Sequence, residues 1–467
     1  MAEPLKKKQK TEGDDEEEAA AQELAAFLAL FQKNLLTQCL CCVSETSLQS
    51  FVFSVSRPFN DDAGQTWTRD SILQFVSSVQ LLCEVAMRQT SRGNVCSRIG
   101  QVCHVLTTNE HGIIDRLVEL STHLDHFVCF TTSRALSAFL LMSKSHVNPA
   151  WLENLVDNAL AASHPRQMCL ALEVMRRVVE WKEFDGHVLE ERGGSEDSHP
   201  ASCNLMKLTD SDSGDCGEVK CACVRVLETK WPLLVSKFEI LVSPYRTENE
   251  ATVVTFLALW EALISVKANL SVADTKPFYD NVKNLVALLV AFPPIVPAVV
   301  WKSLLSLLNE VLCYGSTLAL QDILAEEPCQ LAHNVVRGVK DNHLLDRLPY
   351  QGGNGSFGGG QGDGDRPLLQ KMVLLVLKAV AVTVKETRCD SSDSSLGSEE
   401  DSFDDDMALI ERSIKEVLRQ LDNRVKALVP FHPETPIAEW VVQLFADQDD
   451  ALVESMVSTF LRFTQFN

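Results

Sequence analysis

The sequence predicts an all-α protein, arranged as an irregular armadillo- or HEAT-like helical solenoid with disordered acidic and glycine-rich loops. Apolar residues recur three and four positions apart through almost every ordered stretch, as one face of a helix requires. Alternating, strand-like runs are scarce, and the best of them is FVFSVS at 51–56. Several helices also follow one another across very short turns. Because the spacing shows no strict repeat, one or two irregular helical bundles are the alternative architecture.

The helical period is clearest in SILQFVSSVQLLCEVAM (71–87), where the apolar residues line one face of the expected helix. Asn148–Pro149 and Thr435–Pro436 each place a capping residue before a proline suited to the first helical position, and Gly315 lies where a helix would end. In chain order, the same pattern predicts further helices at 19–42, 110–121, 126–143, 150–162, 166–182, 218–242, 250–266, 276–291, 297–313, 367–385, 405–428, 437–446 and 450–464.

Three stretches form pairs of helices joined by a short turn: 147–181 with the turn SHPRQ, 278–315, and 439–463 with an acidic turn. In each pair the second helix is apolar on several sides, so its partner alone cannot bury it. Stacking on neighbouring pairs would bury the remaining apolar surface, as it does in armadillo and HEAT arrays. The pairs therefore favour a solenoid over a closed bundle.

Charge runs and glycine-rich stretches divide the chain into parts. The segment PYQGGNGSFGGGQGDGD (349–365) is typical of a flexible tether, while two acidic, polar segments are typical of disordered loops. The predicted organisation is a disordered tail at 1–18, a helical array at 19–347 with an acidic loop at 186–217, a glycine-rich linker at 348–366, a helix at 367–388, an acidic serine-rich loop at 389–406, and the C-terminal helices of the array at 407–467.

The charge and cysteine content exclude some classes of protein. The net charge is −22 and the isoelectric point is about 4.9, so we expect no direct binding of nucleic acid, which requires clustered Lys and Arg. The N-terminus lacks the apolar core of a secretory signal. Of the fifteen cysteines, many lie among leucines and valines on expected helices, as do Cys83, Cys103, Cys129, Cys169 and Cys313. Reduced thiols in the cytosol or nucleus are therefore favoured over a disulfide framework.

Two apolar runs resemble membrane spans, and each has a feature that argues against one. Prolines break LVALLVAFPPIVPAVVW (285–301) into two helical pieces. The run MVLLVLKAVAVTV (372–384) is too short to span a bilayer and carries Lys378 at its middle. Both are interpreted as buried helices, and we expect no membrane partner.

Three short motifs have ligand-like spacing, and each has a more ordinary interpretation. CGEVKCAC (216–223) lacks the paired Cys-x-x-Cys knuckles of a structural zinc site, so free thiols are favoured. HLDH (123–126) has no third ligand nearby and is interpreted as a helix junction. GNGSFG (353–358) lacks the flanking strand and helix of a phosphate-binding loop. No nucleophile elbow, HExxH motif, P-loop or kinase signature occurs, so we predict no metal, cofactor or catalytic residue.

The N-terminus carries a dense basic run, PLKKKQK, followed at once by acids from Asp14 to Glu18. The density of lysines and the leading proline are typical of a nuclear-import signal, which an import receptor binds in extended form. The acids would keep the segment solvated and accessible, and a solubilising tail is the alternative. The predicted signal comprises Lys6, Lys7, Lys8 and Lys10, and it predicts a protein of nucleus and cytoplasm.

The loop 389–406 offers two serines to acid-directed kinases. Ser398 is followed by two glutamates and an aspartate, and Ser402 by Asp404 and Asp405. Each phosphate would add nearly two negative charges. An unmodified, solvated loop is the alternative.

The C-terminal stretch WVVQLFADQDDALVESMV (440–457) resembles the Lines family of segment-polarity regulators, in its tryptophan, its Leu-Phe pair and its Gln-Asp-Asp turn. Looser likeness extends over FLALWEALISVKANL (256–270), SLLNEVLCYG (306–315) and RALSAFLLM (134–142). The resemblance covers about 110–460. It implies a non-enzymatic regulator of developmental, Wnt- or Hedgehog-type signalling that moves between cytoplasm and nucleus. It also implies a further C-terminal domain beyond Asn467, so that this chain would be a short form or a fragment.

Three functions follow as hypotheses. The first is a nuclear and cytoplasmic scaffold whose stacked helices bind partner peptides in grooves. The second is an importin-like transport adaptor, or another helical-repeat subunit of a complex; a carrier needs repeated Trp-Asn slots, and only Trp151 with Asn154 has such spacing. The third is an enzyme with an unrecognised helical site. Apart from an import receptor, the partners of this protein cannot be identified from the sequence.

Overall fold

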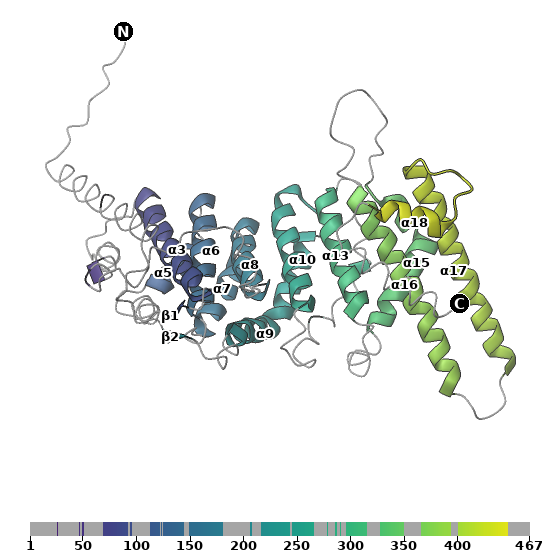
Figure 1. Ribbon diagram of the computed structural model, residues 1–467, viewed down its shortest axis with the longest axis horizontal. Helices are drawn as coiled ribbons and strands as arrows, with labels where there is room; N and C mark the ends of the chain where they lie inside the picture. The colour runs from purple at the N-terminus through teal and green to yellow at the C-terminus, as the bar shows by residue number, and fades with distance from the viewer. Residues whose placement is uncertain are drawn as a thin grey trace, which may run out of the picture. The chain divides into compact units, whose positions relative to one another are not determined.

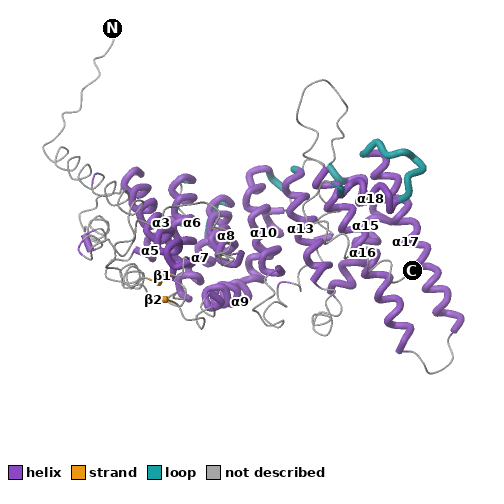
Figure 2. Tube along the Cα trace, in the orientation of Figure 1, coloured by secondary structure: helices purple, strands orange, loops and turns teal. Residues whose placement is uncertain are grey.

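The computed structural model divides into two compact units, Met1–Val226 and Leu227–Asn467. Its described secondary structure consists of helices and two short strands, joined by loops and turns (Figure 2). This confirms the all-α class. The described residues are 26, 46, 49–50, 69–91, 94–95, 113–121, 123, 125–143, 149–180, 206–207, 216–242, 245–265, 278, 285–286, 290, 296–314, 327–349, 366–393 and 400–446.

The first unit is built around α6. This helix packs against α3 and α8, and it also contacts α5, while α7 lies against α5 and α8 (Figure 1). The helix can serve as the centre because it is apolar on several sides, with Ala135, Leu136 and Phe139 among its buried residues. The helices are α3 (Arg69–Ser91), α5 (Ile113–Leu120), α6 (His126–Ser143), α7 (Pro149–Ala161) and α8 (Pro165–Glu180).

A two-residue strand pair was not expected. Strand β1 (Asn94–Val95) pairs antiparallel with β2 (Met206–Lys207), with Val95 opposite Met206. β2 lies inside the segment 186–217, which the sequence predicted to be a disordered loop, so that prediction is wrong at these two residues. A pair this short requires only backbone N–H and C=O groups, so it has no side-chain period to detect.

The second unit is a succession of packed helices. α13 packs against α10 and α16, and α15 lies against α16 and α17 (Figure 1). The boundary between the units falls within α9, after Val226. The helices are α9 (Cys216–Val242), α10 (Glu250–Ser265), α13 (Ala298–Tyr314), α15 (Glu327–Asn342), α16 (Arg366–Asp393), α17 (Glu400–Leu428) and α18 (Ile437–Phe445), with 3-10 turns η6 (Thr247–Asn249) and η8 (Leu344–Arg347).

An aromatic cluster forms part of the core of the second unit. Trp231 of α9 stacks on Phe256 at a centroid distance of 5.3 Å and meets Trp260 and Phe278 edge-on. Phe238 stacks on Phe256 at 4.5 Å. All five rings are buried, and such offset and edge-on pairs add stability beyond that of the buried area.

The last described helix is held by side chains of its neighbours. The final carbonyls of α18, at Gln443 and Leu444, accept hydrogen bonds from Arg366, and Gln370 donates to Leu444 at 2.7 Å. The indole of Trp440 donates to Asp422 of α17 at 2.8 Å. These bonds satisfy carbonyls that have no partner within the helix.

The predicted helices from 71–87 to 437–446 are confirmed, except that 276–291 is described only at a few positions. The structure also contains α15, which the sequence analysis missed. Its core residues Leu331, Val335 and Val339 do follow the helical period, and all are buried. Pro328, Gly338 and a high content of polar residues weakened that signal. The predicted elements at 19–42, 51–56 and 450–464 lie outside the described residues, apart from Ala26.

Two boundaries differ from prediction. α16 runs to Asp393 and α17 begins at Glu400, so the predicted loop 389–406 is helical at both ends. No glycine or proline lies between 389 and 393, so nothing in that stretch ends α16. The acidic residues in the first turns of α17 stabilise that helix, because they interact favourably with the positive end of its dipole. α7 begins at Pro149 as predicted, but Pro436 is the N-cap of α18 rather than its first helical residue.

The apolar run 372–384 belongs to a longer helix than the sequence indicated. The stretch Arg366–Val384 is long and apolar enough to cross a membrane. The prediction that this apolar run is too short to span a bilayer was therefore wrong. Inside the second unit, however, 78% of this window is buried. Lys378 is itself buried and donates to the carbonyl of Asn309 at 3.4 Å. These are features of a core helix.

Candidate functional site

A groove lies between α15 and α17 in the second unit, with Thr383 of α16 at its lining. Its cavity has a volume of about 210 Å³. Pockets that bury a small molecule commonly measure roughly 300–1,000 Å³, so this one suits a side chain or two rather than a cofactor. We call it the α15–α17 groove.

One wall of the α15–α17 groove is basic. His333, Arg337 and Lys340 lie on successive turns of α15 and line it, together with the single carboxylate Asp341. Arg337 is exposed and forms no ion pair with a described residue. With neutral histidine the lining carries one net positive charge, in a chain of net charge −22.

The other wall is apolar. Leu409, Ile410 and Ile414 of α17 face Val336 of α15 across the cavity. Leu409 is 56% exposed, although it is a large apolar side chain on a well-formed helix. The groove therefore combines an accessible apolar surface with nearby cationic groups, a combination common at protein-binding sites.

Hydrogen bonds fix the two walls to each other. Lys340 donates to the hydroxyl of Ser413 at 3.2 Å, and Gln420 donates to the carbonyl of Lys340. Further along, Arg424 donates to the carbonyl of Leu345 at 3.1 Å. The groove is thus held by contacts of α17 with the end of α15 and with the η8 turn that follows it.

A further carboxylate near Lys340 is already engaged. Hydrogen bonds from Arg419 and Gln420, together with the charge of Lys340, lower the pKa of Glu416 to about 2. Glu416 does not line the cavity. It therefore offsets the basic wall only in part.

In the first unit, the start of α6 is a helix junction, as the HLDH interpretation predicted. Asp125 accepts hydrogen bonds from the backbone N–H groups of Phe127 and Val128, which caps the helix. Arg69 of α3 donates to its other oxygen at 2.7 Å. The Arg69 hydrogen bond and the cap keep the pKa of Asp125 below its usual value. Arg69 also lies over the exposed ring of Phe127.

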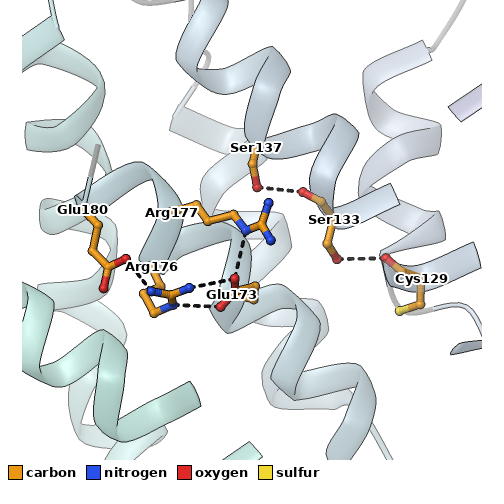
Figure 3. Close-up of polar contacts among 7 residues, drawn as sticks. All are labelled: Cys129, Ser133, Ser137, Glu173, Arg176, Arg177 and Glu180. Atoms are coloured by element: carbon orange, nitrogen blue, oxygen red, sulfur yellow. Dashed lines mark hydrogen bonds and ion pairs between the residues drawn. The ribbon is translucent and has the colours of Figure 1, made fainter. Parts of the chain in front are cut away.

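An ion-pair network runs along α8 (Figure 3). Glu173 accepts two hydrogen bonds from Arg176 and one from Arg177, and Arg176 also pairs with Glu180. Burial alone would raise the pKa of Glu173, but the bonds from both arginines outweigh it and the pKa is lowered. All these partners lie three or four residues apart, so the network stabilises the helix itself rather than forming a reactive pair.

On α6, Ser137 donates to the carbonyl of Ser133, and Ser133 donates to that of Cys129 (Figure 3). These hydroxyls are buried and bonded to their own helix, so no base activates them. Burial is the main cause that raises the pKa of Cys129, and of Cys223, to about 12. Both thiols are therefore poor nucleophiles.

The sequence predicted free thiols rather than disulfides, and the structure agrees for the cysteines whose side chains it describes. Cys83, Cys129, Cys169 and Cys223 are free, and Cys223 contacts the sulfur of Met175 at 3.3 Å. Within the described ranges, no group of three or more His, Cys, Asp or Glu side chains could hold a metal ion. The backbone of Cys216 and Cys221 lies in α9.

The predicted site residues and the groove do not coincide. Lys6, Lys7, Lys8 and Lys10 lie outside the described residues, as does Ser398. Ser402 lies in the first turn of α17. Sequence reasoning missed the groove because it missed α15; the signal available was the basic pair Arg337 and Lys340 three residues apart on an apolar period.

Comparison with known proteins identifies the family of this chain. Residues 204–466 match the model of the Lines N-terminus. The chain is 34% identical to "Protein lines" of Drosophila melanogaster over an alignment of 554 positions, which covers 92% of this chain. The chain spans 64% of the length of that relative. No solved structure matches it.

Proposed function

Because the chain belongs to the Lines family, we propose that it is a non-enzymatic regulator of developmental signalling that acts by binding other proteins. Wnt- or Hedgehog-type signalling is the pathway class that this membership suggests. The observation that supports binding is the α15–α17 groove, an open apolar and basic surface on fixed helices.

The proposed architecture is an armadillo- or HEAT-like stack within each unit. Sequential contacts support it in the second unit, where α10 packs on α13, α13 on α16, and α15 on both α16 and α17. Helices in such a stack expose grooves between neighbours, where partner peptides bind. The α15–α17 groove would be one of these.

The tryptophans argue against the alternative of an importin-like carrier. A carrier of that kind presents exposed tryptophans in repeated slots. Each tryptophan that the structure describes is buried, and Trp151, which has the nearest slot-like spacing, packs edge-on against Phe139. The buried tryptophans are Trp151, Trp231, Trp260, Trp301 and Trp440.

We further propose that the chain is both nuclear and cytoplasmic, and that the basic N-terminal run binds an import receptor. Changing Lys6, Lys7, Lys8 and Lys10 together to alanine should shift a fluorescent fusion of the full chain to the cytoplasm. Receptor pockets require the ammonium groups, so the four alanines remove the recognised charge. The matched control changes Lys267, Lys276, Lys283 and Lys302 to arginine. An unchanged nuclear fraction would exclude this signal.

Proximity labelling of the intact chain in a Wnt- or Hedgehog-responsive cell line tests the function as a whole. Signalling or transcription proteins, enriched over a fusion-tag control, are the expected result. Nuclear-pore and Ran-linked proteins would instead favour a carrier. Loss of the pathway response on depletion, restored by this chain, would link the binding to signalling.

A further inference from the structure

We propose that the α15–α17 groove binds an acidic peptide segment of a partner protein, anchored by one bulky apolar side chain. This inference rests on the proposed protein-binding function and names the chemistry of the partner. Two properties carry it: the charge of the α15 wall and the exposed apolar side chain of Leu409 on the α17 wall.

Charge complementarity favours an acidic occupant. Arg337 and Lys340 present two cations on one face of α15, one turn apart, and only Asp341 opposes them within the lining. Arg337 is exposed, so a carboxylate can reach it without displacing an existing ion pair. A guanidinium also matches carboxylate geometry with two parallel hydrogen bonds.

The negative charge of the rest of the chain does not prevent this. Charges in physiological salt are screened over about 8 Å, so a bound peptide responds chiefly to the groove and its immediate surroundings. Glu416, the carboxylate near Lys340, is already bonded to Arg419 and Gln420. Among the residues that line the cavity the charge stays positive, and this favours an acidic peptide.

The apolar wall gives the peptide an anchor. Leu409, with Ile410 and Ile414 behind it, forms an apolar surface beside the cations, and Val336 faces it. A cavity of about 210 Å³ accepts a leucine- or phenylalanine-sized side chain. Burial of such a side chain removes apolar surface from water and so strengthens binding.

The test measures fluorescence anisotropy of a fluorescein-labelled 15-residue peptide with one leucine flanked by Asp and Glu, titrated with the full chain. A matched peptide carries Asn and Gln in place of the acids. We expect the acidic peptide to bind at least tenfold more tightly. Arg337→Glu and Leu409→Asp should each weaken it at least tenfold, and both residues are exposed, so folding should be retained, as circular dichroism can verify.

Arg412→Glu is the matched control, because it reverses one exposed charge on α17 outside the groove lining. Its affinity should stay within twofold. Equal binding of the neutral peptide, or an equal loss in the Arg412 variant, would overturn the proposal. So would Arg337-dependent binding of polyuridine with no binding of the acidic peptide.

Carbodiimide coupling of Lys340 to carboxylates identifies other occupants. A link to residues 447–467 in the monomer would assign the groove to the chain's own C-terminal segment, and a link between two copies would assign it to self-association. Either result overturns the inference. If Arg337→Glu leaves the proximity-labelled partners unchanged, protein binding stands and only the groove is excluded; if the wild-type chain enriches no partner, the proposed function itself fails.

Discussion

At the scale of single residues, several polar groups in the described part of the chain bond within the helix on which they lie. Asp125 caps α6, Glu173 joins two arginines on α8, and Ser133 bonds to its own helix. These patterns are local in sequence, three or four residues apart, so sequence reasoning can propose them. Whether a given carboxylate is also half-buried depends on the neighbouring helix, which the sequence does not specify.

Glu173 should make stability depend on pH. Glu173→Gln should lower the free energy of unfolding at pH 7 by about 1–2 kcal/mol, because two arginines lose a half-buried anionic partner. Its folded pKa lies below the unfolded value, so its contribution is full above the unfolded pKa and is lost as the pH falls through the folded pKa. Urea unfolding from pH 7 to pH 3 measures this.

The control is Glu180→Gln, which removes the more exposed partner of Arg176. Its effect at pH 7 should be the smaller of the two. A Glu173 variant whose deficit is unchanged at pH 3 would show that the ion pairs are not the cause.

Replacing either of the two central tryptophans of the aromatic cluster with phenylalanine should lower the stability of the protein by a different amount. The indole of Trp260 donates to the carbonyl of Phe278 at 2.7 Å, while that of Trp231 has no acceptor among the described residues. Trp260→Phe leaves that carbonyl unpaired, so it should cost about 1–3 kcal/mol more than Trp231→Phe. Paired denaturant titrations measure the difference, and equal losses would contradict it.

At the scale of elements, the apolar periodicity predicted which helices exist better than it predicted the residues at which they begin and end. The starts of α6 and α7 fall at or next to the predicted residues, because capping and proline signals are local. α15 escaped detection, since Pro328 and Gly338 lower its helix propensity. The extensions of α16 and α17 into the serine-rich segment show that acidic composition alone does not end a helix.

Gly338 is a test of α15. A methyl group placed there would meet side chains of Leu344, Val286 and Val290 at 3.7 Å, which is ordinary contact. Gly338→Ala should therefore raise the free energy of unfolding by about 0.5–1 kcal/mol through helix propensity. Gly338→Ile, which adds branched bulk to the same contacts, should lower it. Thermal unfolding of both variants measures these changes in stability. Destabilisation by Gly338→Ala would contradict the packing of α15 described for this position.

At the scale of the whole molecule, the chain has two compact units, and the Lines match begins within the first unit and continues through the second. α9 supplies Trp231 and Phe238 to the aromatic cluster of the second unit. The second unit therefore needs the part of α9 that carries these two rings, which follows the unit boundary.

A fragment of residues 204–467 should unfold cooperatively, with near-ultraviolet circular dichroism from its packed tryptophans. A fragment of residues 250–467 should not, because Phe256 and Trp260 lose the rings that bury them. Thermal scans of both fragments beside the full chain measure this. A cooperative transition in the shorter fragment would show that the cluster is dispensable.

The sequence by itself determined the helical class, most of the helices and the family, because each rests on short-range periodicity or on similarity along the chain. Tertiary structure decided where the α15–α17 groove forms. Arg337 and Leu409 lie 72 positions apart, and only the packing of α15 against α17 brings their surfaces to one groove. Packing of that kind depends on the fit of many distant side chains at once, and no local pattern encodes it.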